Sequence, residues 1–361
     1  MIFSVISILI LFSVIILVHE TGHFLAARRV GIRVEKFSLG FGPRIFSVKR
    51  GDTEYQLSLL PFGGFVKLAG DEEGEEKESY ENWEYMGKSP GHRSQVIVAG
   101  SIGNLVLAFL LLIPVFMMGM PGYDGTKIGA LVEGFSAETT GLEIGDEILE
   151  VNGTPCKEWM DVLLNIRRAI EVSHTDPVEL VVRRDNEIIN VKAMPSLYQG
   201  DEDGAGVYIL GITPKEKTER YGIGQAVVRS AKEFYKMLYS IFLSIKMLIT
   251  KQVSPKNLAG PIGIAQWGAD IARSGLSRFL YYVAFISVNL GVVNLLPFPV
   301  LDGGHLAGLL GERIIRRKPS KKFLEWSAYV GFMLIIGLAL YVTYNDILRV
   351  MTEIATKRRG G

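Results

Sequence analysis

The chain has few cysteines, few histidines and almost no net charge. Its one cysteine, Cys156, excludes an internal disulfide framework and is interpreted as an ordinary thiol beside a turn. The formal net charge is +1 over 361 residues, which leaves no basic footprint for nucleic acid. The residues are 48% hydrophobic and the mean hydropathy is +0.25. This composition indicates a membrane protein that carries soluble parts.

Charge is scarcest at the N-terminus. From Met1 to Ala27 the only formal charge is Glu20, and Arg28 and Arg29 follow directly. A run of this length and composition predicts a transmembrane helix. A secretory signal peptide fits badly, because the run has no basic n-region and is too long.

Three ionisable side chains stand inside this run: His19, Glu20 and His23. Residues four apart share one face of a helix, so both imidazoles can bind one zinc ion with Glu20 beside them to handle protons. The bland alternative is a chance His-Glu-x-x-His string on a soluble helix. Ionisable groups inside a membrane segment cost free energy, so their presence there indicates a function. We therefore favour an intramembrane zinc protease.

The chain contains four stretches that are nearly free of charge and long enough to cross about 30 Å of hydrocarbon. They are Ile2–Ala27, Val96–Met120, Phe279–Leu301 and Trp326–Asn345. A fifth apolar stretch, Val227–Thr250, is interrupted by charged residues. It predicts an amphipathic helix that lies at the membrane surface or against the other helices.

The number of spans decides whether the polar residues can meet. With four spans, the ends of the first and the third emerge on the same side; a fifth span would put them in opposite leaflets. Basic residues between the third and fourth spans favour a cytoplasmic loop there. The basic residues of the C-terminal tail favour the opposite orientation. These loop residues are Arg313, Arg316, Arg317, Lys318, Lys321 and Lys322. On this map residues 28–95 are cytoplasmic, residues 121–278 are extracytoplasmic, and both termini lie outside.

A catalytic zinc site needs a third protein ligand, and Asp302 is the best candidate. It ends the third apolar stretch, where Pro297 and Pro299 must break the helix and Gly303-Gly304 let the backbone turn. The alternative is a helix-ending carboxylate at the water interface. His305 is a weaker candidate ligand, favoured as an interfacial histidine or one that supports the ligands.

Buried amides on the second and third spans need partners. Asn289 and Asn294 could pair with an unwound substrate backbone, or could simply hydrogen-bond to other helices. The run from Gly100 to Asn104 is interpreted first as a close helix contact. Contact between Asn104 and the active site is the sharper alternative.

Two soluble segments are expected. Glu54–Leu68 alternates and contains Pro61, Gly63 and Gly64, which suggests a hairpin of short strands. Residues 127–194 predict strands at Ile128–Val132, Glu147–Val151 and Val178–Val182, with an amphipathic helix at Trp159–Ile170.

With these residues in view, the chain resembles the site-2 protease family (peptidase M50-like), in particular the bacterial RseP-type enzymes. The resemblance rests on His19-Glu20-Thr-Gly-His23 and on Asn294…Pro297…Pro299…Asp302-Gly303, and it covers nearly the whole chain. It implies Zn²⁺ bound by His19, His23 and Asp302, with Glu20 as base and with Asn289 and Asn294 holding substrate. It also implies that the hairpin adds a strand to an extended substrate. One departure is Gly100-Ser101-Ile-Gly-Asn104, where relatives tend to have Gly-Pro-x-x-Asn.

The segment from Ala137 to Gly153 resembles the turn and strand of a bacterial, permuted PDZ domain, present here once. Tyr208–Ile212 could supply the strand that edges the peptide groove. PDZ domains usually capture peptide ends by strand addition. We favour instead a steric filter that excludes bulky extracytoplasmic domains from the active site.

The predicted fold is a polytopic α-helical membrane protein of the bacterial inner membrane. Its four transmembrane helices form a zinc protease core with a cytoplasmic β-hairpin and an inserted extracytoplasmic α+β PDZ domain. The expected parts are residues 1–120 (first half of the core, hairpin at about 45–70), 124–214 (PDZ-like domain), 220–275 (amphipathic helices) and 276–361 (second half of the core).

The predicted function is zinc-dependent cleavage of transmembrane segments in single-pass proteins. The resemblance implies anti-sigma factors or remnant signal peptides as substrates, and leaves room for an upstream site-1 protease. Two alternatives remain: a membrane-anchored PDZ receptor or scaffold with structural zinc, and an anchored peptidase for soluble peptides.

Overall fold

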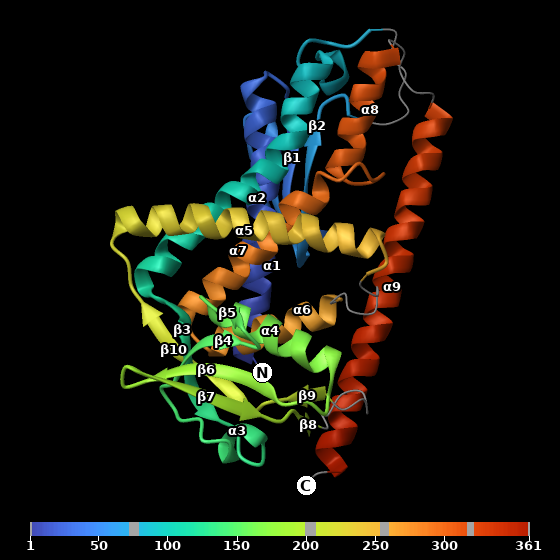
Figure 1. Ribbon diagram of the computed structural model, residues 1–361. Helices are drawn as coiled ribbons and strands as arrows, with labels where there is room; N and C mark the ends of the chain where they lie inside the picture. Colours follow the sequence, from blue (N-terminus) through green and yellow to red (C-terminus); the bar gives the residue numbers. More distant parts are fainter. Residues whose placement is uncertain (1, 72–78, 199–206, 253–259, 316–320, 360–361) are drawn as a thin grey trace. The chain divides into compact units, whose positions relative to one another are not determined.

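A computed structural model describes residues 2–71, 79–198, 207–252, 260–315 and 321–359 (Figure 1). The chain forms two compact units. The first comprises residues 1–118 and 221–347, and the second comprises residues 119–220 and 348–361. Residues 316–320 of the basic loop used for orientation lie outside the described residues.

The first unit is built mainly from helices. Four of them are long and apolar enough to cross a membrane: Ile6–Arg29, Pro90–Met118, Leu276–Asn294 and Trp326–Leu348. They belong to helices α1 (Ile2–Arg29), α2 (Pro90–Met118), α7 (Leu276–Asn294) and α9 (Lys321–Arg359). Helices α1, α2 and α7 pack side by side (Figure 1). The expectation of a multi-pass membrane protein is confirmed at this level.

Glycines let α1 and α2 approach closely. A Cβ atom on Gly22 of α1 would lie within 2.9 Å of the backbone of Gly100 on α2, and one on Gly103 would lie 3.0 Å from the carbonyl oxygen of Val18. Without side chains at these positions the two backbones can touch, as small residues allow in membrane helices. The run from Gly100 therefore forms the close helix contact expected from the sequence.

The third span is shorter than the sequence suggested. Helix α7 ends at Asn294 rather than Leu301, because the region before Pro297 cannot stay helical and Pro299 lacks a backbone donor. Asp302 does not end this helix but begins the next one, α8 (Asp302–Ile315). The connecting turn is tight: Val300 has a φ of +78°, which a β-branched residue rarely adopts.

The hairpin is larger than expected. It pairs β1 (Val34–Arg50) with β2 (Thr53–Leu68), with one turn at Gly51, and β2 itself reverses between Leu57 and Gly64, within the segment predicted from the sequence. Glycines and a proline interrupt the alternation of β1, and this hid the strand in the sequence. Phe37 pairs with both Tyr55 and Val66, which shows that the strands bend back on themselves. A short 3₁₀ helix, Tyr85–Gly87, precedes α2.

Two further helices complete the first unit: α5 (Ile223–Ile249) and α6 (Pro261–Arg273). Helix α5 runs across α2 and α7, which it contacts (Figure 1). The ring of its Phe234 lies 6.1 Å from that of Phe109 on α2. The sequence left two placements open for Val227–Thr250, at the membrane surface or against the other helices. The structure shows that one face of α5 packs against the other helices.

The second unit is an α+β fold around one sheet. In the six-stranded sheet the order is β10-β3-β4-β6-β7, with β5 paired to β4, and β8 pairs separately with β9. Helix α4 (Trp159–Val172) buries Trp159, Val162, Ile166 and Ile170 in the hydrophobic core. The strands are β3 (Met120–Leu131), β4 (Glu147–Val151), β5 (Thr154–Pro155), β6 (Val178–Arg184), β7 (Glu187–Ala193), β8 (Ser196–Tyr198), β9 (Val207–Ile209) and β10 (Ile212–Glu219); a short helix α3 covers Ser136–Thr139.

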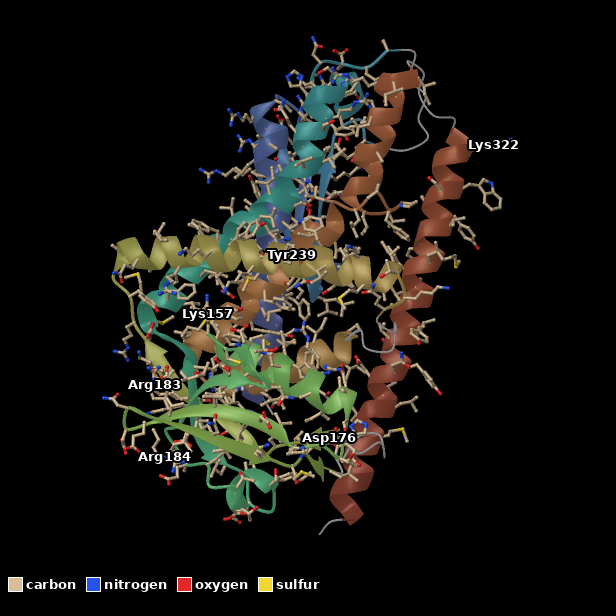
Figure 2. The ribbon with its side chains drawn as sticks, in the orientation of Figure 1. Lys157, Asp176, Arg183, Arg184, Tyr239 and Lys322 are labelled. Carbon is tan, nitrogen blue, oxygen red and sulfur yellow. The ribbon has the colours of Figure 1, made fainter. Side chains whose placement is uncertain are left out.

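A buried ion pair ties two parts of this unit together. Asp146 is 1% exposed, and both its carboxylate oxygens accept hydrogen bonds from Arg184, at 2.7 and 2.8 Å (Figure 2 labels Arg184). Burial by itself would raise the pKa of Asp146, but the hydrogen bonds from Arg184 and from the backbone N–H of Glu143 lower it below its usual value.

Replacing Asp146 by asparagine is expected to destabilise the second unit by about 1.5–3 kcal/mol, because Arg184 loses a charged partner. In the native protein the depressed pKa contributes stability above the unfolded value of about 3.9, and this contribution is lost as pH falls through the folded value. Hydrogen exchange of β4 and β6 measures the effect. Asp176→Asn, at an exposed carboxylate, is the control; equal protection in both variants would contradict the prediction.

Candidate metal centre

The two histidines of the sequence motif face the same point. His19 and His23 lie on successive turns of α1, with ring centroids 4.7 Å apart, and their Nε2 atoms are separated by 3.2 Å. His19 is buried, and His23 is held against α2, where its Nδ1 lies 2.8 Å from the carbonyl oxygen of Val96. That hydrogen bond requires a proton on Nδ1 of His23, so the lone pair of its Nε2 points toward His19.

Asp302 brings a carboxylate oxygen to the same point from α8. Its Oδ2 lies 3.4 Å from Nε2 of His19 and 3.6 Å from Nε2 of His23. A tetrahedral zinc ion with bonds of about 2.0–2.2 Å holds its ligands about 3.3–3.6 Å apart. The three donor atoms thus have the chemistry and the mutual spacing of a zinc site. The tight turn after α7 is what brings this carboxylate back to the two histidines.

A second layer of polar groups orients these side chains. The side-chain amide of Asn104 on α2 lies 3.3 Å from Nδ1 of His19, and Ser101 donates a hydrogen bond to Oδ2 of Asp302 at 3.3 Å. Oδ1 of Asn104 is buried and has no partner among the described residues. Turning the amide lets this oxygen accept the Nδ1–H of His19, which leaves Nε2 of His19 free to bind a metal.

For the second span, contact between Asn104 and the active site was the alternative to a simple helix contact. The structure shows this contact between Asn104 and His19. The role of Ser101 was missed, because a serine in a small-residue run is typical of ordinary helix packing. A signal was present: Ser101 stands three residues before Asn104, so both can face one neighbour.

Glu20 lies beside the cluster and close to the hairpin. A Cβ atom on Gly64 of β2 would stand only 3.0 Å from Cγ of Glu20 and 3.3 Å from Ile16. Gly64 therefore lets an extended strand pass directly against the proposed base. This places the hairpin next to the polar cluster, which the sequence alone did not show.

The other candidate residues lie at different distances from the cluster. The amide nitrogen of Asn294 is 3.4 Å from Nε2 of His19, so this residue borders the cluster. Asn289 donates instead to the carbonyl oxygen of Phe285 in its own helix, at 2.8 Å. His305 is exposed and does not belong to the group of converging donors found among the described residues.

A buried ion pair holds the far end of α8. Nη2 of Arg93 on α2 lies 2.9 and 3.1 Å from the two carboxylate oxygens of Glu312. The side chains are 5% and 17% exposed. Since α8 runs from Asp302 to Ile315, it is attached to α2 at two levels, through Ser101 near its start and through Arg93 near its end. These contacts fix the direction in which Asp302 enters the cluster.

Replacing Arg93 by glutamine is expected to cost about 3–5 kcal/mol of stability, because Glu312 is left buried without its partner. Thermal unfolding of the detergent-solubilised chain measures the loss. The double variant Arg93→Met/Glu312→Leu, which removes both charges, is expected to recover most of it. A single variant as stable as the native chain would show that the pair does not hold α8.

Two histidines one turn apart, a carboxylate from another helix and an adjacent glutamate form the kind of site that metallopeptidases use. The sequence comparison supports the same class. The chain matches peptidase family M50 over residues 7–338. It belongs to this family, and the expectations of a metalloendopeptidase and of a site-2 protease relationship are confirmed.

Several relatives span nearly the whole chain. A Clostridium perfringens protein named as a zinc metalloprotease is 36% identical over 341 residues, covering 94% of this chain and 97% of its own length. The zinc metalloprotease RasP of Bacillus licheniformis is 29% identical over 425 residues, covering 96% and 99%. The regulator of sigma-W protease RasP of Bacillus subtilis is 29% identical over 426 residues, covering 96% and 98%.

Proposed function

We propose that the protein is a zinc-dependent intramembrane endopeptidase that cleaves transmembrane segments of single-pass membrane proteins. The observation that carries this proposal is the convergence of His19, His23 and Asp302 on one point, with two of the donors inside an apolar helix long enough to span a membrane. The relatives named as zinc metalloproteases support zinc as the metal. We assign these three residues as its ligands.

Zinc supplies Lewis acidity at such a site: it lowers the pKa of water and polarises a peptide carbonyl. The residues of the chain do the rest. Glu20, one residue from His19 on the same helix, takes a proton from the attacking water and passes it to the leaving amine. Asn104 and Ser101 keep the ligands oriented, and the surrounding helices exclude bulk water.

The hairpin and the amides of α7 present the substrate. A helical substrate hides its carbonyl groups in hydrogen bonds, so it must become extended before cleavage. Strand β2 passes Glu20 at Gly64, and an extended substrate could add to the sheet beside it. Asn294, at the edge of the cluster, would hold the unwound backbone; Asn289 is retained as a second, more distant contact.

We assign the second unit as a single PDZ-like domain on the extracytoplasmic side, acting as a size filter. Its sheet with one packed helix fits such a domain. We propose that the active site lies toward the cytoplasmic face of the cell membrane, and the basic residues at the end of α1 and between α7 and α9 support this orientation. Since one relative is named a regulator of sigma-W protease, membrane-bound anti-sigma factors are proposed substrates, together with an upstream site-1 protease.

The scaffold alternative requires a closed structural zinc site with four protein ligands. The converging group among the described residues has three members. Three protein ligands leave a position for water, which favours catalysis over a structural role.

The deciding experiment uses the full chain reconstituted in lipid vesicles with a single-pass substrate. We expect about one zinc per chain, cleavage within the transmembrane segment, and loss of both in His23→Ala. Asp302→Asn should release zinc to a chelator more readily. Zinc-free purified protein that still cleaves would overturn the proposal, and so would a zinc-loaded chain that cleaves no substrate.

A further inference from the structure

Helix α5 is fixed near the end of a membrane span. The backbone N–H of Tyr221, just before α5, donates to the carbonyl oxygen of Phe116 near the end of α2. Phe234 on α5 contacts Phe109, about two and a half turns before α2 ends. Helix α5 runs across α2 (Figure 1), and the contacts of this segment with Phe116 near the end of α2 and with Tyr281 near the start of α7 lie in one half of the proposed membrane core.

The charges of α5 are almost all of one sign. The helix carries four cations, Arg229, Lys232, Lys236 and Lys246, and one acid, Glu233. That acid is already engaged, since Oε1 of Glu233 accepts a hydrogen bond from the hydroxyl of Tyr281 on α7 at 2.7 Å. Arg229 stacks over the ring of Tyr221 at 4.9 Å. The three lysines are left without a counter-ion on this helix.

These lysines face outward. Lys232, Lys236 and Lys246 are exposed, whereas the opposite side of α5 buries Ala226, Ser230, Met237 and Ile241 against the other helices. Within the described part of the chain, no carboxylate forms an ion pair with any of the three. The three ammonium groups are therefore available to an anionic partner outside the described chain.

An exposed aromatic strip runs beside the lysines. Tyr235, Tyr239 and Phe242 are 68%, 60% and 57% exposed (Figure 2 labels Tyr239). They stand three or four residues from Lys232, Lys236 or Lys246, so the two sets are neighbours on the helix surface. Aromatic rings with polar tips favour the boundary between headgroups and acyl chains. Water alone would be a poor environment for this strip.

We infer that this face of α5 binds anionic phospholipid headgroups, with Lys232, Lys236 and Lys246 on the phosphates and the aromatic strip at the acyl boundary. The inference rests on the proposed membrane location. An acidic protein segment could also neutralise the lysines. It would not account for an adjacent aromatic strip on a helix that runs across α2, whereas a lipid surface satisfies both.

The test titrates the purified full chain in neutral detergent with short-chain phosphatidylglycerol or phosphatidylcholine and counts bound lipid by native mass spectrometry. Native protein should bind phosphatidylglycerol at least about tenfold more tightly, and salt should reduce the difference. In Lys232→Gln/Lys236→Gln/Lys246→Gln this preference should disappear. Each lysine removed should lower the affinity for phosphatidylglycerol about fivefold. The matched control, Lys157→Gln/Lys192→Gln/Lys215→Gln, removes three exposed cations from the second unit and should keep the preference.

Three results would overturn the inference: no preference in the native chain, an unchanged preference in the α5 variant, or displacement of the lipid by polyglutamate at lower concentration. The last would assign the surface to an acidic protein segment. Zinc content, measured on the same samples, separates this test from that of the proposed function. A zinc-loaded chain without lipid preference contradicts only the lipid site.

Discussion

Replacing Gly100 by alanine is expected to abolish zinc binding while leaving the helices intact. A Cβ atom at this position would overlap the imidazole of His23, with its Cε1 and Cδ2 atoms at 2.6 and 2.8 Å. The backbone here is closely packed against α1, so the imidazole must move. Since it carries a proposed zinc ligand, moving it removes one of three donors. Zinc affinity should fall at least about 100-fold.

The effect can be separated from a general loss of stability. Alanine has a higher helix propensity than glycine by about 0.8–1.0 kcal/mol, so the substitution itself favours the helix. Gly91→Ala, on the same helix but with open space around the added carbon, is the matched control and should keep its zinc. Elemental analysis after purification gives the result. Native zinc content in Gly100→Ala would mean that His23 is not a ligand.

Replacing Glu20 by glutamine is expected to lower the cleavage rate by about 10²–10⁴-fold with zinc retained. The two side chains have the same shape, and Glu20 is not among the three converging donors. Only the ability to take up a proton is lost. Single-turnover cleavage in reconstituted vesicles, with zinc measured on the same sample, tests both halves of the expectation.

Glu20→Asp provides the comparison for this variant. It keeps a carboxylate but withdraws it along α1, so a proton can still be transferred over a longer distance. We expect a rate between those of the native chain and Glu20→Gln. If Glu20→Gln cleaves as fast as the native chain, another group is the base. If it loses zinc, Glu20 has a role in metal binding instead.

Much of the membrane core could be predicted because apolar length is a local property. The absence of charge along 20 or more residues marks a span without any knowledge of its neighbours. The motif around His19 could also be interpreted from the sequence, since helical periodicity alone puts His23 on the same face of the helix. Asp302 was predicted by residue type and by the side of the membrane on which it must emerge.

Other features depended on contacts that no local pattern contains. The first part of β1, from Val34, was not predicted as a strand, because β1 is broken by glycines and looks irregular until it pairs with β2. Asp302 had been placed at the end of a helix, and the chain instead reverses in a tight turn so that it begins α8. Ser101, Arg93 and Glu312 have ordinary sequence surroundings.

The sequence by itself thus determined the number of apolar spans and the chemical identity of the donor set, because both follow from composition and helical period. Tertiary structure alone decided that the donor atoms are separated by the ligand–ligand distances of a tetrahedral zinc ion. It also decided that β2 runs beside Glu20. Those distances arise where separate helices touch, and they depend on glycines that let backbones meet at Gly22, Gly64 and Gly100.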